Sequence, residues 1–287
     1  MPNLCRAPIG KFSPFGILIA ISTAVILAPS PAHAQLITMS KECREAVASG
    51  DAMNAAGNYQ EALNLFTGIV EECDTKDGSE AVQVGLAKAH NGLGQYAEAV
   101  AAADLALEVS KQDSLGALHE KAVALEAQGD LQGAKDQYLA IIALTENNVD
   151  TAARANNYAK VADLEYRSEN RQSANAYLDK AIELDPDNPA YNVQRGDWAT
   201  NEGDAARAQA ELDAAAAKGG SSPEMYAIRF ETTMKSMQEK YGTDNVQALR
   251  SSMTAAETES ICRDARGAID NGLADMQIEM FIALVCK

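Results

Sequence analysis

The side chains that most often carry nucleophilic, redox or metal chemistry are few in this chain, which has 5 cysteines and 3 histidines among 287 residues. No Cys-x-x-Cys pair occurs and no histidine lies close to a cysteine in sequence, which disfavours a redox centre. The sequence also lacks a Gly-x-Ser-x-Gly elbow, a Walker loop, a His-Glu-x-x-His motif and a calcium-loop spacing. We therefore expect no enzymatic activity, no metal and no cofactor. The alternative within catalysis is a site without a known motif in residues 223–287.

Two histidines and two aromatic residues remain as candidates for chemistry or ligand binding. His119 stands next to Glu120, but adjacent residues of a helix point in different directions, so we expect no acid–base pair. His90 is expected to pack between helices as a core imidazole. Tyr191 and Trp198 could stack on a ligand, although the position of Trp198 favours the core.

The composition favours a densely helical protein and excludes one class of partner. The chain contains 54 alanines and 8 prolines, the best and the worst helix formers, and 47% of its residues are hydrophobic. That fraction is too high for a disordered chain. The formal net charge is −17 and the pI is about 4.6, whereas nucleic-acid binding requires clustered Lys and Arg. We therefore expect no nucleic-acid partner.

Residues 1–34 have the organisation of a cleaved export signal. Arg6 and Lys11 give a positive start, residues 15–27 form an apolar run, and Ala32-His33-Ala34 supplies the small residues of a signal-peptidase site. The alternative is a membrane anchor, but this run would span only about 20 Å of a hydrocarbon core that is about 30 Å thick. We therefore predict cleavage after Ala34 and a periplasmic protein, with secretion as the second choice. Loss of two cations and no acid would change the net charge from −17 to −19.

One pattern recurs at a nearly constant interval through the remaining sequence. A Gly or an equivalent residue is followed five positions later by an alanine, and the five alanines are Ala62, Ala99, Ala134, Ala174 and Ala208. Twelve residues before each alanine stands another small residue, namely Gly50, Ala87, Ala122, Ala162 and Gly196. In a helical hairpin these positions would lie where the two backbones approach most closely. Large residues four positions after the alanines would fill the flanking layers, at Phe66, Tyr138, Leu178 and Leu212.

These five copies resemble the tetratricopeptide repeat family. The resemblance implies an all-α, right-handed superhelical solenoid of about five helical hairpins with a helical C-terminal cap. The array would cover residues 35–222, with units at 43–76, 80–113, 115–148, 155–188 and 189–222 and a longer connection at 145–154. Unit 4 departs from the pattern because Glu169 replaces the turn glycine. The alternative fold is a related solenoid of helical hairpins.

Four cysteines remain after the predicted cleavage, and they allow three disulfide connectivities. Cys43 opens the first helix of unit 1 and Cys73 ends its second helix, so an antiparallel hairpin would bring them to the same end. Cys262 and Cys286 flank a second candidate hairpin that turns at residues 270–272. We therefore expect structural disulfides Cys43–Cys73 and Cys262–Cys286, one at each end of the array, where the outermost repeat lacks a neighbour. The alternative for these cysteines is redox activity.

The repeat pattern fades after residue 222. Residues 223–240 are expected to form a sixth first helix, and residues 246–286 two or three further helices. The last of these ends in an apolar run at 280–285, which is too short to span a membrane. We expect residues 223–287 to form a cap that covers the last hairpin. The alternative is a helix that docks on a partner.

The resemblance also implies a binding surface, because the first helices of successive tetratricopeptide units line a concave groove. The matching positions are Arg44, Val47, Asp51 and Asn54 in unit 1, Val84, Lys88 and Asn91 in unit 2, His119, Val123 and Glu126 in unit 3, Asn156, Asp163, Tyr166 and Arg167 in unit 4, and Val193, Asp197 and Thr200 in unit 5. Family members that clamp acidic C-terminal tails need Lys and Asn at set positions, where unit 1 has Val47 and Asp51. A mixed groove on an acidic chain favours a protein or peptide partner with cationic character.

The first functional hypothesis is therefore a non-enzymatic periplasmic scaffold that binds a protein or peptide in this groove. It would act in envelope assembly, maintenance or secretion. The alternative is a periplasmic module that binds a small ligand or a peptidoglycan fragment through Tyr166 and the aromatic residues of unit 5.

Overall fold

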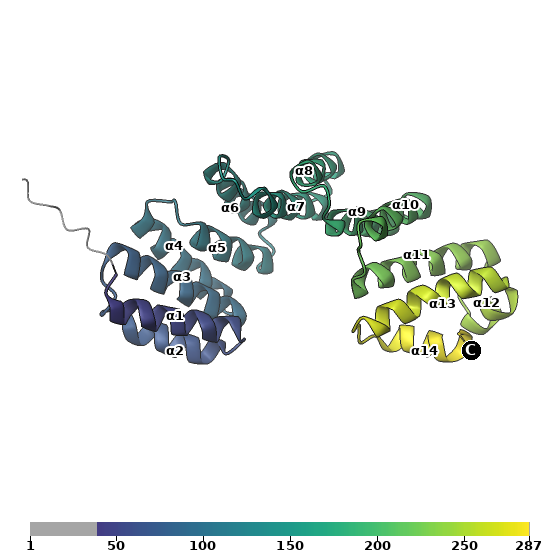
Figure 1. Ribbon diagram of the computed structural model, residues 1–287, viewed down its shortest axis with the longest axis horizontal. Coiled ribbons are helices and arrows are strands. Elements are labelled where there is room, and N and C mark those ends of the chain that lie inside the picture. Colours follow the sequence, from purple (N-terminus) through teal and green to yellow (C-terminus); the bar gives the residue numbers. More distant parts are fainter. Residues whose placement is uncertain (1–38, 287) are drawn as a thin grey trace, which may run out of the picture. The chain divides into compact units, whose positions relative to one another are not determined.

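The computed structural model describes residues 39–286, and all regular structure in that range is helical (Figure 1). The predicted signal peptide at 1–34 lies outside the described residues. The first ten helices form five antiparallel hairpins: α1 (Lys41–Ala55) with α2 (Tyr59–Ile69), α3 (Lys76–Gly92) with α4 (Tyr96–Ser110), α5 (Leu115–Ala127) with α6 (Leu131–Leu144), α7 (Thr151–Arg167) with α8 (Arg171–Leu184), and α9 (Pro189–Asn201) with α10 (Ala205–Ala217).

Each hairpin packs against the next hairpin along the chain. The odd-numbered helices α1 to α9 are called the first helices below, and the even-numbered helices α2 to α10 the second helices. Every second helix contacts the first helix that follows it, and α3 also contacts α1 and α5. This succession of neighbour contacts is the all-α solenoid that the sequence predicts.

Small residues allow the helices to approach, as the repeat pattern predicts. All ten paired Gly and Ala positions are buried, and the large residues that follow them are at most 1% exposed. Phe66 of α2 shows why the small residues are needed. A Cβ atom added to Gly50 of α1 would lie 2.5 Å from its ring, and one added to Gly85 of α3 only 2.2 Å. The ring therefore fits against α1 of its own hairpin and α3 of the next.

The hairpin turns share one backbone conformation. Gly57, Gly94, Gly129 and Gly203 all have positive φ angles, which cost glycine little. Glu169 occupies the same place in the turn between α7 and α8 and has a φ of +64°. The substitution therefore leaves the turn intact but places a side chain in the left-handed region.

A polar cap sets the start of α7. The Asp150 carboxylate accepts a hydrogen bond from the backbone N–H of Ala153 at 3.0 Å and so caps the start of α7. The helix therefore begins at Thr151, four residues before the predicted start of unit 4. The predicted connection at 145–154 is correspondingly too long, because the repeat pattern does not mark Asp150 as a cap.

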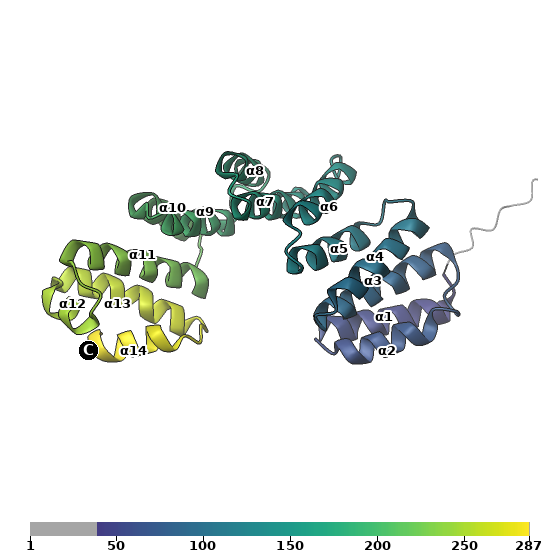
Figure 2. The same cartoon turned by 180° about the vertical axis from the view of Figure 1, so that it is seen from behind.

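Residues 223–286 form four further helices. α11 (Pro223–Tyr241) contacts α9 and α10, as expected of a sixth first helix. It pairs with α13 (Ala255–Asp270) across the short α12 (Val246–Ser252), and α13 turns at Gly272 into α14 (Met276–Val285). In both views α13 lies between α11 and α14 (Figures 1 and 2). These helices form the C-terminal cap of the array.

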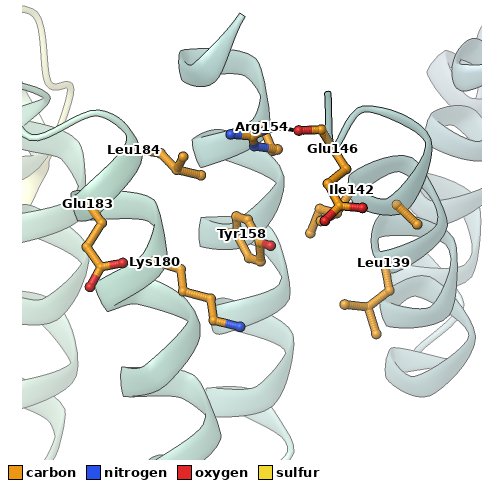
Figure 3. Close-up of a pocket in the computed structure, with 9 residues that line it drawn as sticks. Leu139, Ile142, Glu146, Arg154, Tyr158, Lys180, Glu183 and Leu184 are labelled. Carbon is orange, nitrogen blue, oxygen red and sulfur yellow. Dashed lines mark hydrogen bonds between the residues drawn. The ribbon is translucent and has the colours of Figure 1, made fainter. Parts of the chain in front are cut away.

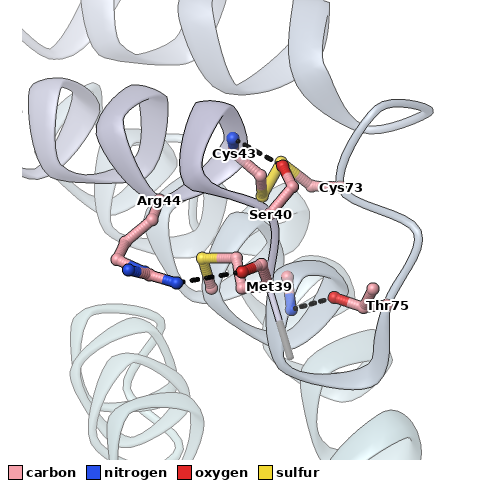
Figure 4. The surroundings of a disulfide bond; sticks show 7 residues. Met39, Ser40, Cys43, Arg44, Cys73 and Thr75 are labelled. Carbon is pink, nitrogen blue, oxygen red and sulfur yellow. Dashed lines mark hydrogen bonds between the residues drawn. A yellow bond between two sulfur atoms is a disulfide. The ribbon is translucent and has the colours of Figure 1, made fainter. Parts of the chain in front are cut away.

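Two disulfides join the cysteine pairs expected from hairpin geometry. The Sγ atoms of Cys43 and Cys73 are 2.03 Å apart, and those of Cys262 and Cys286 are 2.06 Å apart. The first bond lies at the start of α1, where the Ser40 hydroxyl accepts a hydrogen bond from the backbone N–H of Cys43 (Figure 4). The pairing prediction is confirmed.

The turn at Glu169 gives a stability prediction. A left-handed backbone costs a non-glycine residue about 1–2 kcal/mol. Replacing that residue by glycine removes this cost, but the gain is partly cancelled because glycine has more conformational freedom in the unfolded chain. We expect Glu169→Gly to raise the free energy of unfolding by about 0.5–1 kcal/mol in urea titrations. Gly129→Glu, the reverse change at the same turn position, should lower it. Equal effects of the two variants on the free energy of unfolding would contradict a left-handed backbone at residue 169.

The contact between Phe66 and Gly85 gives a second prediction. Gly85→Ala would force a Cβ atom into the ring, and such overpacking costs about 1–3 kcal/mol. Gly68→Ala in α2 is the matched control, because a Cβ atom there meets nothing within 4 Å and alanine favours the helix by up to about 1 kcal/mol. Thermal melts should thus shift in opposite directions. A stabilising Gly85→Ala would show that the ring is not held as described.

Candidate functional site

The first helices and α11 together form the surface on which the predicted groove residues lie. The helix α3 contacts both α1 and α5, and α9 contacts α11. Long side chains join α7 to α9: the Gln194 amide donates to the Ala159 carbonyl at 3.1 Å, and the Tyr191 hydroxyl lies 2.9 Å from Asn156 Oδ1. We call this surface the first-helix face.

Three predicted groove residues are buried between helices and do not face a partner. Val47 belongs to the core of the first two hairpins. Asn54 is 2% exposed and donates from Nδ2 to the Gly85 carbonyl at 3.0 Å, which links α1 to α3. Thr200 is 3% exposed, and its hydroxyl lies 2.6 Å from that of Thr232 on α11. These positions hold the first helices together, so we leave them out of the proposed binding surface.

His119 and Glu120 contact each other, so the expectation that they would not pair is wrong. His119 Nδ1 lies 3.4 Å from Glu120 Oε1, because the flexible Glu120 side chain can bend toward the imidazole of its neighbour. Asn91 of α3 donates to both the Glu120 carbonyl and its carboxylate at 2.9 Å. Burial alone would raise the pKa of Glu120, but the hydrogen bonds from His119 and Asn91 outweigh it and lower the pKa. The group links α3 to α5.

His90 also differs from its expected place. It is half-buried rather than enclosed in the core, and its Nδ1 atom lies 2.7 Å from Gln95 Oε1 in the turn that follows α3. The imidazole of His90 therefore has a polar partner in the turn of its own hairpin.

Arg167 brings together predicted residues from two units. Its guanidinium pairs with the Glu126 carboxylate of α5 and lies 3.4 Å from Asp163 on its own helix. This contact bridges units 3 and 4 on the first-helix face. Arg167 is exposed, so its pairing remains accessible to a competing charge.

The aromatic residues of units 4 and 5 cover one another. Trp198 and Tyr191 are each 2% exposed, which confirms the core assignment of Trp198. Tyr166 stacks on Trp198 with ring centroids 4.5 Å apart and an angle of 4°, and the Arg171 guanidinium lies over its ring at 3.6 Å. These contacts occupy the surfaces that a small ligand would stack on. They do not favour the small-ligand alternative.

Three carboxylates interact across α7, α9 and α11, namely Asp163, Asp197 and Glu231, here called the acidic row. Burial raises the pKa of Asp197, and the charges of Glu231 and Asp163 raise it further. Asp163 has Arg167 nearby, and Glu231 pairs with Lys235 at 2.7 Å. Asp197 makes no ion pair with any residue between 39 and 286. The Asn201 hydrogen bond and the charge of Lys235 lower its pKa only in part, so Asp197 is a half-buried carboxylate whose charge is incompletely offset.

Glu231 is absent from the predicted groove positions, although the sequence contains a signal for it. Asp197 lies as far from Asp163 in sequence as Glu231 lies from Asp197, and this separation equals one repeat period. Extending the groove positions into the predicted sixth first helix would find Glu231.

A cleft of about 430 Å³ on α1, α3 and the start of α5 contains two predicted residues, Asp51 and Val84. It is also lined by the exposed Leu115 and by three carboxylates that the family pattern does not mark; these are Asp77, Glu80 and Asp113. Burial raises the pKa of Asp51, and the nearby charge of Lys88 only partly offsets this increase. We call this cleft, which joins carboxylates and apolar side chains, the N-terminal cleft.

The remaining predicted residues lie apart from these groups. The exposed Arg44 donates to the Met39 carbonyl at 3.1 Å, beside the first disulfide (Figure 4). Lys88 and Asn156 are exposed, and Val123 and Val193 are half-buried.

A further cleft of about 610 Å³ lies between α6 and the pair α7–α8, away from the predicted groove residues (Figure 3). Arg154 donates there to the carbonyls of Thr145 and Glu146. Lys180 lies over the rings of Tyr158 and Tyr177 at 5.5 and 5.4 Å. The cations of this cleft already have partners inside the protein.

Two general findings concern the described residues. Between residues 39 and 286, no group of three or more His, Cys, Asp or Glu side chains is placed to hold a metal ion. Among the helices in this range, none is both long and apolar enough to cross a membrane.

One family model matches part of the repeat array. Residues 53–122 match the family model described as tetratricopeptide repeat. No curated protein matches the sequence significantly. Among solved structures, PilF of Pseudomonas aeruginosa is 14% identical over 84% of this chain and 97% of that chain, with a TM-score of 0.59. A tetratricopeptide repeat protein from Parabacteroides merdae is 13% identical over 86% of this chain and 100% of that chain, with a TM-score of 0.56.

MamA of Desulfovibrio magneticus is similar over a shorter part of this chain. It is 17% identical over 63% of this chain and 97% of that chain, with a TM-score of 0.52. At such identities the structural likeness shows the fold alone. With the matched repeat model, it confirms the tetratricopeptide solenoid that the sequence predicts.

The acidic row gives a prediction of pH dependence. Because the pKa of Asp197 is raised in the folded protein, its ionisation opposes folding above that pKa and has no effect below the unfolded value of about 3.8. Asp197→Asn should therefore be more stable than the parent at pH 7, and this gain should disappear as the pH falls toward 3.8. Denaturant titrations across this range measure the difference. A gain in stability that does not change with pH would contradict a raised pKa of Asp197 in the folded protein.

Proposed function

We propose that this tetratricopeptide solenoid is a non-catalytic adaptor that binds a protein or peptide with cationic side chains on its first-helix face. The observation that carries the proposal is the carboxylate of Asp197. It is half-buried, has no ion pair with a described residue, and is repelled by the charges of Glu231 and Asp163, which the charge of Lys235 offsets only in part. A partner cation would offset both the burial and the repulsion that raise its pKa.

The N-terminal cleft supplies a second place for a basic side chain. Four carboxylates face a cleft whose other walls include Ala81, Val84 and Leu115. Lys and Arg side chains have apolar stems and charged ends, so they match this mixture. The cleft and the acidic row lie on different first helices, which supports an extended or helical partner that contacts several repeats. The net charge of −17 would further steer a cationic partner toward the chain.

We further propose a periplasmic location, with secretion as the second choice. The support is the signal-like organisation of residues 1–34 together with the two disulfides, since such bonds persist in oxidising compartments. An adaptor in that compartment would act in envelope assembly, maintenance or secretion. The shared tetratricopeptide fold supports a role in protein interaction without naming the partner.

Charge reversal on the first-helix face tests the proposal. The full chain retrieves its partner from a crosslinked periplasmic extract, and the affinity for the purified partner is then measured. We expect Asp163→Lys and Asp197→Lys each to weaken binding by about tenfold or more, as losing a close interfacial charge pair does. Loss of affinity should be greatest at low salt, where charges are least screened.

Glu183→Lys on α8 is the matched control. It makes the same charge change on a second helix, at an exposed residue without an ion pair to the described residues. Its affinity should equal that of the parent. Equal losses in all three variants would indicate a general charge effect, and no loss at Asp197 would refute the assigned surface. A ligand-induced melting shift without any protein partner would favour the small-ligand alternative.

A further inference from the structure

A cleft of about 500 Å³ lies between α11 and the start of α14, beyond the last predicted groove position. Its lining is divided equally between apolar and polar residues. The apolar residues are Ala227, Ile228, Phe230, Met234 and Ile278, and the polar residues, called the rim below, are Glu231, Lys235, Gln238, Asp275 and Gln277. We call it the C-terminal cleft. The predicted role of residues 223–287 as a cap does not require such a cleft.

The C-terminal cleft is continuous with the acidic row. Glu231 belongs to both, because it lines the cleft and its charge raises the pKa of Asp197 on the neighbouring helix. Lys235 also lines the cleft, but its ammonium group is paired with Glu231 at 2.7 Å. A side chain in the cleft and a cation at Asp197 could therefore come from the same partner.

The apolar wall is fixed by the core of the cap. Phe230 packs edge-on against Phe281 of α14, with ring centroids 5.0 Å apart and an angle of 72°. Ile278 is 4% exposed, and it belongs with Met234 to the hydrophobic cluster of the cap. The cleft is therefore formed before a partner arrives, which is typical of sites that accept an apolar group.

Building on the proposed function, we infer that the C-terminal cleft receives one apolar side chain of the basic partner. Charge complementarity identifies this occupant, because the adjoining carboxylate of Asp197, which has no ion pair with a described residue, favours a basic peptide over an acidic or neutral one. The partner would present a cation to Asp197 and an apolar residue to the cleft beyond it. Burial of such a side chain would strengthen binding by about tenfold or more.

Labelled synthetic peptides test this inference with the full disulfide-bonded chain. One set contains only Lys and Gly, and a second set carries a single Leu that is moved along the same sequence. Fluorescence anisotropy gives each affinity. For the parent chain, the best Leu-containing peptide should bind about tenfold or more tightly than its Lys–Gly counterpart.

Two neighbouring substitutions separate filling of the cleft from a general effect of a large side chain. Gln277→Trp fills the cleft from an exposed position of its rim. Met276→Trp introduces the same side chain at an adjacent residue that is 74% exposed and does not line the cleft. We expect Gln277→Trp to abolish the gain from Leu and Met276→Trp to keep it. Thermal melts check that both variants remain folded.

The outcomes distinguish this inference from the proposed function. If Lys–Gly peptides bind and Asp197→Lys weakens them, but Leu adds nothing or its gain survives Gln277→Trp, the inference is overturned and the proposed function stands. If no basic peptide binds, with or without Leu, both fail. Loss of the Leu gain in Gln277→Trp alone supports both.

Discussion

The whole structure depends on one packing constraint, which is that no hairpin covers its own apolar surface. Phe66 shows this most clearly, because its ring lies against Gly50 in its own hairpin and Gly85 in the next. The small residues are therefore needed both for packing within their own hairpin and for packing against the neighbouring hairpin. Such contacts make a solenoid a chain of nearest-neighbour interfaces. The disulfides Cys43–Cys73 and Cys262–Cys286 lie at the two ends of this series, where one neighbour is missing.

The same constraint produces the candidate binding surface. Because first helices follow one another at the repeat period, side chains one period apart in sequence come together on one face. Asp163, Asp197 and Glu231 are brought together in this way, and the raised pKa of Asp197 records the cost. Asp163 and Glu231 have cationic neighbours, whereas Asp197 has no ion pair with a described residue, so its charge costs the folded chain stability. Local destabilisation of this kind is common at functional sites, where binding offsets it.

Much of the fold can be predicted from the sequence, but less of the site. Spacing alone identifies the buried small residues and the turn, and hairpin geometry then pairs the cysteines. The family pattern assigns Asn54 and Thr200 to the groove, yet both lie in contacts between first helices, whose closeness a linear pattern does not reveal. The His119–Glu120 contact depends on side-chain bending. The C-terminal cleft forms only because α14 returns to α11 from far along the chain.

A basic partner is expected to contact the first-helix face and not the second helices. Site-specific photo-crosslinking tests it most directly, with a photoreactive residue placed at Asn201 at the end of α9 or at the exposed Ala210 on α10. With a labelled peptide of Lys, Gly and one Leu, we expect a crosslink at Asn201, competed by unlabelled peptide, and none at Ala210. A crosslink at Ala210 without one at Asn201 would contradict it.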